Sequence, residues 1–415
     1  MNNYERESEI IQKQYSENNY KRYYKLFLSF FIIIVIFIAG LSAGGVMSYR
    51  ITSFYIDEMQ EEILNLQNQN ENIEFQNITY IYDDYSISEL YEEVKDSIVV
   101  INGFVTYNSI FGTQYAPVQG SGFVYEFDKE MVVITNNHVV RDTTELTVTF
   151  SNGNSYPAMT TGSDVYSDLA VLSVQAPSEE FKPLEIASSS ILEVGDPVIA
   201  IGSPFGLGGT MTTGIISQLG RTIEDSLAGN FPIANIVQSS APINPGNSGG
   251  PLLNYQGEII GITTAIIRDS NGLGFAIPSN TILREIESLI KTGSYNQHPW
   301  LGISGVDMTY SIAKTMEINV TYGWLIAQIT KEGSADKAGL RGGNQQIKIN
   351  EDWVITGGDI IIAVDGIRVI NGDAFMSYLQ EYTWPGKNII VTIIRDNQII
   401  DTPVVLGIRP PISYT

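Results

Sequence analysis

The chain has 415 residues, of which 43% are hydrophobic and 17% are charged, and its formal net charge is −23. This length allows two or three domains, and the composition is that of a globular rather than a disordered chain. The large negative charge argues against nucleic acid as a partner, because phosphate binding requires basic patches. Zero cysteines and only two histidines exclude disulfides and a cysteine nucleophile, and no catalytic zinc site is expected.

The N-terminal segment predicts a membrane anchor. Residues 1–25 are polar and end in a basic cluster, whereas residues 26–47 form an apolar run without a charge. Such a run is long enough to span a bilayer as one helix. The basic cluster before it predicts that residues 1–25 are a cytoplasmic tail and that the remainder lies outside the cytoplasm. A cleaved signal peptide is the alternative, because small residues near Gly40 and Ala43 could form a cleavage site.

Residues 48–85 are interpreted as a stalk. Apolar residues recur there at alternating spacings of three and four, with Asn70 on the same seam: Ile56, Met59, Ile63, Leu66 and Ile73. This is a heptad pattern over about two and a half repeats, which fits a short coiled coil. A plain amphipathic helix or a flexible linker fits equally well.

The sequence pattern of residues 86–291 predicts a mostly β domain. A helical pattern covers Glu89 to Lys95, and another covers Thr281 to Lys291 at the end of the domain. Between them, short β-type runs alternate with turn clusters, as in an all-β sandwich or barrel. The runs include Ile98 to Val105, Gly122 to Tyr125, Met131 to Thr135, Leu146 to Phe150, Ala170 to Val174 and Pro197 to Ile201.

A candidate nucleophile, Ser248, lies in the glycine-rich stretch Asn244 to Pro251. Glycines on both sides allow a sharply bent backbone that exposes the hydroxyl and can turn N–H groups toward one point, as an oxyanion hole requires. A serine nucleophile usually needs a histidine base. His138 follows an apolar strand-like run, whereas His298 precedes a proline in a linker-like stretch.

The third member of such a site is an acid, and two aspartates compete for the role. Asp168 lies directly before the apolar run Leu169 to Leu172, and Asp164 lies four residues earlier. The order His138, Asp168, Ser248 is that of chymotrypsin and not that of subtilisin or the α/β-hydrolases.

Five motifs in this region resemble the HtrA family of trypsin-like serine proteases. They are Thr135 to Val140, Asp168 to Leu172, Ala200 to Gly206, Asn244 to Pro251 and Gly274 to Pro278. The resemblance implies two six-stranded barrels with the catalytic cleft between them. It also implies the catalytic set His138, Asp168 and Ser248, and favours Asp168 over Asp164.

The resemblance further implies an oxyanion hole formed by the amides of Gly246 and Ser248. Asn247 stands where trypsin-type zymogens carry an aspartate, so activation by N-terminal cleavage is not expected. The expected substrate pocket, Ile243, Thr264 and Ala265, has no acidic residue, which predicts cleavage after small or medium aliphatic residues. No metal, nucleotide or organic cofactor is expected.

A linker, residues 292–299, leads to residues 300–410, which resemble the PDZ domain that HtrA proteases carry. The matching segments are Trp300 to Ile303, Gly333 to Leu340 and Gly358 to Gly366. The resemblance implies that Leu301, Gly302 and Ile303 bind the carboxylate of a peptide, which adds as a strand to the sheet. The connection Gly342 to Gly357 is longer than is usual there.

The sequence therefore predicts a membrane-anchored, mostly β serine endopeptidase of unfolded or damaged protein or peptide substrates, assembled as a homotrimer as the resemblance implies. A non-catalytic chaperone or stress sensor with the same fold is the alternative, and a peptide-binding scaffold is a third class. The presence of all three residue types, histidine, aspartate and serine, favours the enzyme.

Overall fold

The structure is a computed structural model that describes Lys25, Leu28 and residues 86–411, except 110–111, 204–208, 226–230, 245, 265–272 and 350. Residues 84–415 form one compact unit. The predicted cytoplasmic tail, transmembrane segment and stalk (residues 1–85) lie outside the described residues, apart from Lys25 and Leu28. Within the described part of the chain, no helix is both long enough and apolar enough to cross a membrane.

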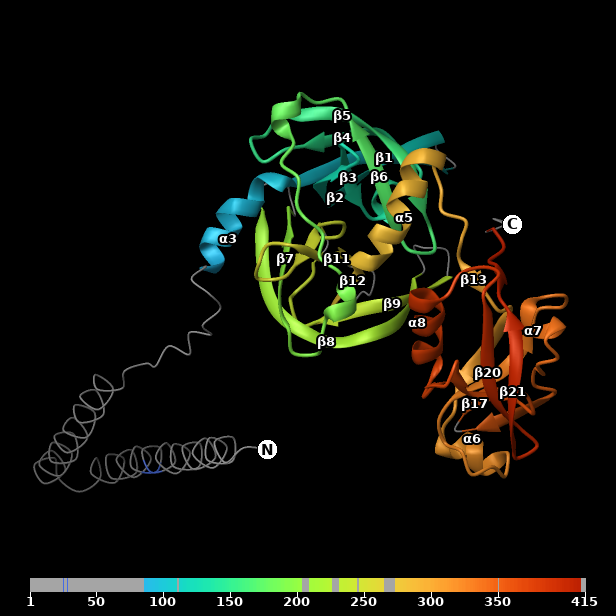
Figure 1. The fold of residues 1–415 in the computed structure, drawn as a ribbon. Coiled ribbons are helices and arrows are strands. Elements are labelled where there is room, and N and C mark those ends of the chain that lie inside the picture. The colour runs from blue at the N-terminus through green and yellow to red at the C-terminus, as the bar shows by residue number, and fades with distance from the viewer. Residues whose placement is uncertain are drawn as a thin grey trace, which may run out of the picture. The chain divides into compact units, whose positions relative to one another are not determined.

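Two closed barrels of six strands follow one another along the chain (Figure 1). The first has the strand order β1-β2-β3-β6-β5-β4 and the second β10-β11-β12-β9-β8-β7. The mostly β, double-barrel fold predicted from the sequence is therefore confirmed. The strands of the first barrel are β1 (Ile98–Ser109), β2 (Gly112–Phe127), β3 (Glu130–Thr135), β4 (Thr143–Thr149), β5 (Ser155–Asp164) and β6 (Leu169–Val174). Those of the second are β7 (Pro197–Gly202), β8 (Thr210–Asp225), β9 (Phe231–Ser239), β10 (Pro251–Leu253), β11 (Ile259–Thr264) and β12 (Gly274–Pro278).

Helices pack against the barrels, and one of them contacts both barrels. Helix α3 (Ile87–Val94) begins with a capping box, in which Ser86 and Glu89 satisfy each other's backbone N–H groups. Helix α5 (Ser279–Thr292) contacts β5 and β6 of the first barrel and β11 and β12 of the second. Its apolar side chains join one core cluster that extends through both barrels. The remaining helical turns here are η1 (Lys95–Ser97), α4 (Asn137–Val140), η2 (Ser178–Glu180) and η3 (Ser189–Ile191).

The C-terminal module, residues 299–408, contains a six-stranded antiparallel sheet, two short two-stranded sheets and short helices. Its main sheet has the order β14-β15-β18-β20-β21, so β14 is an edge strand. The long connection predicted at 342–357 is a hairpin, β16 (Gln345–Ile349) and β17 (Asp352–Thr356). The other elements are β13 (Pro299–Trp300), β14 (Ile303–Asp307), α6 (Tyr310–Thr315), β15 (Trp324–Ile329), α7 (Ser334–Lys337), β18 (Ile360–Val364), β19 (Ile367–Arg368), α8 (Gly372–Tyr382), β20 (Asn388–Arg395), β21 (Gln398–Val405) and β22 (Gly407–Ile408).

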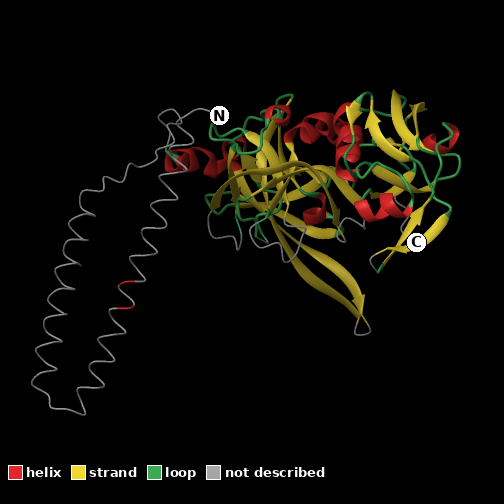
Figure 2. Cartoon of the chain, turned by 90° about the horizontal axis from the view of Figure 1, so that it is seen from below, coloured by secondary structure: helices red, strands yellow, loops and turns green. Residues whose placement is uncertain are grey.

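Strands dominate both the barrels and the C-terminal module (Figure 2). Helix α8 of the module contacts β8 and β9 of the second barrel. There the Asp373 carboxylate accepts a hydrogen bond from the backbone N–H of Thr222 at 3.0 Å, and the Glu381 carboxylate accepts one from Asn235 at 2.8 Å. These polar contacts join the module to the barrel that carries the candidate nucleophile.

Candidate active site

Ser248 lies in a bent loop just before β10, and both barrels hold that loop. The Ser248 carbonyl accepts a hydrogen bond from the N–H of Ser121, on β2, at 2.8 Å. Gly249 N–H donates to the carbonyl of Thr263, on β11, at 2.9 Å. The hydroxyl of Ser121 also donates to the Gly246 carbonyl at 2.6 Å. The loop is therefore fixed at the junction of the two barrels.

The glycines of this loop have a steric reason. Gly249 has φ +86°, and a Cβ built on it would lie 2.2 Å from both the carbonyl oxygen of Ser121 and Oγ1 of Thr135. Gly246 also has positive φ, at +97°. Only glycine adopts such angles without strain, and at position 249 no side chain fits. The backbone of this loop therefore requires glycine at position 249 and favours it at position 246.

His138 belongs to α4, a single helical turn that follows β3. Its Nδ1 lies 2.7 Å from Oδ2 of Asp168, and its backbone N–H donates to Oδ1 of the same carboxylate at 2.8 Å. One carboxylate therefore holds both the ring and the main chain of His138. With Nδ1–H donating to Asp168, the imidazole presents Nε2 as its basic nitrogen.

Asp168 is completely buried and has a left-handed backbone with φ +50°. Such a conformation is uncommon for a residue with a side chain and persists only where surrounding contacts fix it. Its carbonyl accepts hydrogen bonds from the Asn137 N–H at 3.1 Å and from the Asn136 side chain at 3.0 Å. Thr264 Oγ1, from the second barrel, lies 3.5 Å from Oδ2.

Asp164, the competing acid, is paired with the other histidine. Its Oδ2 lies 2.8 Å from Nε2 of His298, and both side chains are buried. The sequence interpretation of His298 as a linker residue therefore missed its burial. Asp164, His298 and Glu285 also form the single group of three ligand-type side chains found among the described residues.

The predicted pocket and carboxylate-binding residues, where they are described, lie in the loop before Ser248 and in or next to strands β11 and β14. Thr264 is buried at the end of β11, and Ile243 is half-buried in the loop before the nucleophile. Ala265 lies outside the described residues. Gly302 has φ +77°, and Ile303 begins the edge strand β14. Sequence reasoning did not single out Ser121, because nothing in its local pattern marks the contact with the Ser248 loop.

Comparisons with known proteins agree with this geometry. The profile described as "Trypsin-like peptidase domain" matches residues 120–262. The Arabidopsis thaliana protein "Protease Do-like 1, chloroplastic" is 35% identical over 332 residues, which cover 79% of this chain and 73% of the relative. The chain belongs to the HtrA family of trypsin-like serine proteases. It is accordingly a serine-type endopeptidase.

Two further proteins of this family are similar to the chain. A "Probable periplasmic serine endoprotease DegP-like" of Chlamydia pneumoniae is 37% identical over 299 residues, covering 71% of this chain but only 56% of that protein. The solved structure "HtrA-type protease AlgW with decapeptide" has a TM-score of 0.59 and 27% identity, and the match covers 79% of this chain and 100% of that one. The likeness to AlgW thus includes both the barrels and the C-terminal module.

Proposed function

We propose that this HtrA protease hydrolyses peptide bonds of unfolded or damaged proteins with His138, Asp168 and Ser248 as its catalytic residues. The observation that carries the proposal is the 2.7 Å contact between His138 Nδ1 and Asp168 Oδ2. It joins a buried acid to a histidine at the junction where the Ser248 loop is held. Asp168 rather than Asp164 is the catalytic acid, because Asp164 pairs with His298.

In the proposed reaction, Oγ of Ser248 attacks the scissile carbonyl while Nε2 of His138 takes its proton. Asp168 keeps the imidazole in the productive tautomer and stabilises the imidazolium. The imidazolium then gives the proton to the leaving amine, and the acyl-enzyme remains on Ser248. A water molecule, deprotonated by His138, attacks the ester and releases the acid product with the free serine.

The amides of Gly246 and Ser248 are proposed to bind the tetrahedral oxyanion, a contribution of roughly 3–4 kcal/mol per donor. Gly246 has a φ of +97°, a backbone conformation that glycine adopts without steric cost. We propose that the pocket for the substrate side chain on the N-terminal side of the scissile bond is lined by Ile243, Thr264 and Ala265. Apolar and hydroxyl side chains without an acid favour small or medium aliphatic residues there.

The C-terminal module is proposed to be a PDZ domain, residues 300–410, that binds peptide C-termini for substrate capture or activation. Support comes from β14, which is the edge strand of its sheet and is also contacted by α8. A peptide could add to that edge by backbone hydrogen bonds, with its carboxylate at Leu301, Gly302 and Ile303. The structure of AlgW with a decapeptide agrees with peptide binding in a relative.

We further propose that residues 86–291 form the protease domain, that residues 26–47 anchor the chain in a membrane, and that both globular parts lie outside the cytoplasm. The periplasmic relatives support an extracytoplasmic protease domain. The proposed assembly is a homotrimer supported by the stalk. Light scattering of two shortened chains, beginning at Ile51 and Ser86, tests this: monomers from both would refute the trimer, and trimers equally resistant to dilution would refute the stalk.

Digestion of unfolded casein by the full-length protein tests the proposed activity. The wild type and a Ser190→Ala control, which loses an exposed hydroxyl, are expected to cleave casein, whereas Ser248→Ala is expected to be inactive. Cleavage by Ser248→Ala would remove Ser248 from the role. Casein binding without cleavage by the wild type would favour the non-catalytic chaperone.

A further inference from the structure

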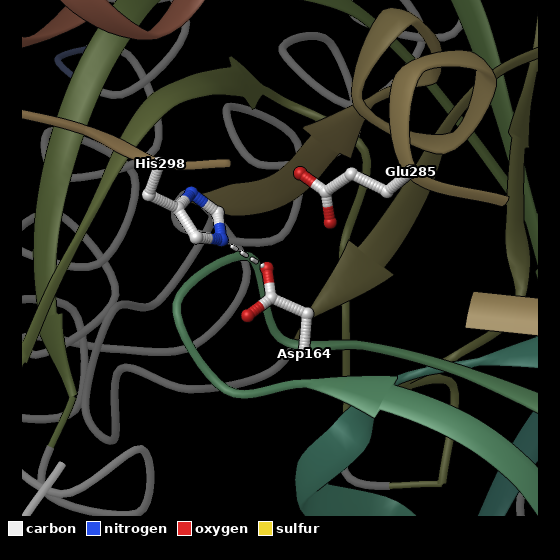
Figure 3. A group of neighbouring side chains, drawn as sticks. All are labelled: Asp164, Glu285 and His298. Atoms are coloured by element: carbon white, nitrogen blue, oxygen red, sulfur yellow. Dashed lines mark hydrogen bonds and ion pairs between the residues drawn. The ribbon is translucent and has the colours of Figure 1, made fainter. Parts of the chain in front are cut away.

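A buried polar cluster lies beside the turn that carries Asp168. It consists of Asp164 at the end of β5, Glu285 in the middle of α5 and His298 just before β13 (Figure 3). Their exposed fractions are 4%, 0% and 3%. The ligand atoms of the three side chains lie within 4.8 Å of one another. Such a concentration of ionisable groups in a core is costly unless the groups neutralise one another.

Asp164 closes the turn that leads to Asp168. Its Oδ1 accepts a hydrogen bond from the N–H of Tyr166 at 3.1 Å, and its Oδ2 accepts one from the N–H of Ser167 at 3.1 Å. The Nε2 of His298 also contacts Oδ2, at 2.8 Å. Asp168 follows directly, with its strained φ of +50°. The carboxylate of Asp164 therefore holds the backbone from which the Asp168 side chain reaches His138.

The two oxygens of Glu285 are in unequal surroundings. Oε1 accepts hydrogen bonds from Oγ of Ser167 at 2.8 Å and from the Arg284 guanidinium at 2.7 Å. Oε2 is buried and has no hydrogen-bond partner. A buried carboxylate oxygen without a donor is expensive, whereas a protonated oxygen can itself donate. The asymmetry is that of a carboxylic acid, with Oε1 as its carbonyl oxygen and Oε2 as its hydroxyl.

Resting on the proposed function, we propose that Asp164, Glu285 and His298 are positioning residues for the catalytic Asp168, with Glu285 a neutral acid that donates its proton to the Asp164 carboxylate. Two like charges this close in a core cannot both be maintained, so one proton is shared between the carboxyl groups. Asp164 keeps the negative charge because it has the histidine and two backbone donors. Glu285 has a single cation, Arg284, on its other oxygen.

The electrostatics of the surrounding groups agree with this assignment. Burial and the nearby Asp164 charge raise the pKa of Glu285 well above its ordinary value, despite Arg284. Burial also opposes ionisation of Asp164, but the hydrogen bond and charge of His298 lower its pKa below the ordinary value. The other charged or titratable groups near the cluster are Arg284 on α5, Tyr166 on the turn, Tyr295 in the linker and Arg409 near the C-terminus.

A proton explains these contacts better than a metal ion does. Oδ2 of Asp164 already has two donors, and so does Oε1 of Glu285. The Arg284 guanidinium binds Glu285 directly, and the Arg409 guanidinium lies over the ring of Tyr166 at 4.0 Å. A divalent ion would have to displace donors and sit close to this positive charge.

The cluster also joins the turn to both ends of the C-terminal module. The His298 carbonyl accepts a hydrogen bond from the Arg409 N–H at 3.0 Å. The Tyr166 hydroxyl donates to the Pro410 carbonyl at 2.5 Å. The His298 side chain itself contacts Asp164, so its loss is expected to disturb Asp168 although the linker is distant from it in the sequence.

Infrared spectroscopy of the full-length protein tests the protonation of Glu285 without reference to activity. The wild type at neutral pH is expected to show the carbonyl band of a buried carboxylic acid, and Glu285→Gln is expected to lose it. Glu287→Gln, on the exposed face of the same helix, is the matched control and should keep the band. A band that survives in Glu285→Gln would overturn the proposal. A chelator that lowers the unfolding temperature of the wild type, but not of Glu285→Gln, would assign a metal instead.

Kinetics test the positioning role. Glu285→Gln reproduces a neutral acid and should keep kcat within about twofold, whereas Asp164→Asn should lower kcat by about 10- to 100-fold with KM little changed. A misplaced Asp168 stabilises the imidazolium less, so in Asp164→Asn the acid limb of kcat/KM should move to lower pH. If kcat/KM of Asp164→Asn is lower at every pH but its acid limb stays at the wild-type pH, the role of Asp164 is purely structural and the positioning claim is overturned. If the wild type cleaves nothing, the proposed function fails while the infrared result still decides the protonation.

Discussion

Asp168 Oδ2 lies 2.7 Å from Nδ1 of His138, and the same carboxylate also accepts the backbone N–H of His138 at 2.8 Å. The acid thus fixes the ring and the main chain together, so that the position of the base depends on one buried side chain. This relationship ranks the two candidate acids. The carboxylate that touches His138 should matter far more for catalysis than the one that supports its turn.

Asp168→Asn should therefore lower kcat by about 10⁴-fold, because an amide holds the wrong imidazole tautomer. Asp164→Asn should leave considerably more activity, since it disturbs Asp168 only indirectly. Initial rates of casein digestion at equal folded fractions, checked by circular dichroism, give the ranking. The reverse order would make Asp164 the catalytic acid.

Gly249→Ala should destabilise the protein and abolish cleavage. Its Cβ would lie 2.2 Å from two oxygens, and φ is +86°. The positive φ costs about 1–2 kcal/mol, and forcing the overlap adds about 1–3 kcal/mol. Gly153→Ala is the matched control, because Gly153 has φ +87° but nothing within 4 Å of a built Cβ. Urea unfolding of both variants separates the clash from the backbone strain, and equal losses would contradict the steric explanation.

The buried carboxyl groups predict a dependence of stability on pH with two limbs. The pKa of Glu285 is raised in the folded state. Its contribution to the free energy of unfolding is therefore present below its unfolded pKa and is lost as pH rises through its folded pKa. The pKa of Asp164 is lowered, so its contribution is present above its unfolded pKa and is lost as pH falls through its folded pKa.

Unfolding temperatures measured across pH check this assignment. In Glu285→Gln the unfolding temperature should fall less steeply toward alkaline pH than in the wild type. In Asp164→Asn it should fall less steeply toward acid pH. An alkaline decline that is identical in the wild type and Glu285→Gln would show that Glu285 is already ionised in the folded protein.

In the C-terminal module, Asp359→Ala should be strongly destabilising. Asp359 is 1% exposed and accepts two hydrogen bonds from Arg395, at 2.7 and 2.6 Å, besides one from the Arg341 N–H at 2.7 Å. Breaking such a buried pair costs about 3–5 kcal/mol. Asp352→Ala, at an exposed aspartate whose φ is not positive, should change stability by less than about 0.5 kcal/mol. Similar urea midpoints for the two variants would contradict this ranking.

The sequence predicted the fold and site best where residues of catalytic type lie next to strand-like runs. The strand-like runs predicted a β sandwich or barrel, and the resemblance of the five motifs predicted the double barrel that the structure has. The same motifs singled out His138 and Asp168, whose side chains are in contact. The helix at Glu89 to Lys95 was predicted within two residues of its observed start, since its amphipathic pattern has no competing signal. The choice between Asp164 and Asp168 needed the resemblance, because both precede the same strand.

Long-range packing could not be predicted in this way. His298 reads as a linker residue because Asn, Gln and Pro surround it, and its burial arises from contacts with β5 and α5 that no local pattern contains. Glu285 was part of an amphipathic helix and showed no sign of facing a second carboxyl group. The hairpin at 342–357 was recognised as extra length, but its pairing was not.

Labelling of the full-length protein with a fluorophosphonate probe, followed by mass spectrometry of the labelled peptide, tests the central claim most directly. The probe reacts only with a serine that a base has activated. Wild type should carry the label on Ser248, whereas His138→Ala, which keeps the hydroxyl but loses the base, should remain unlabelled. A label on another serine, or equal labelling of Ser248 in His138→Ala, would contradict the catalytic assignment.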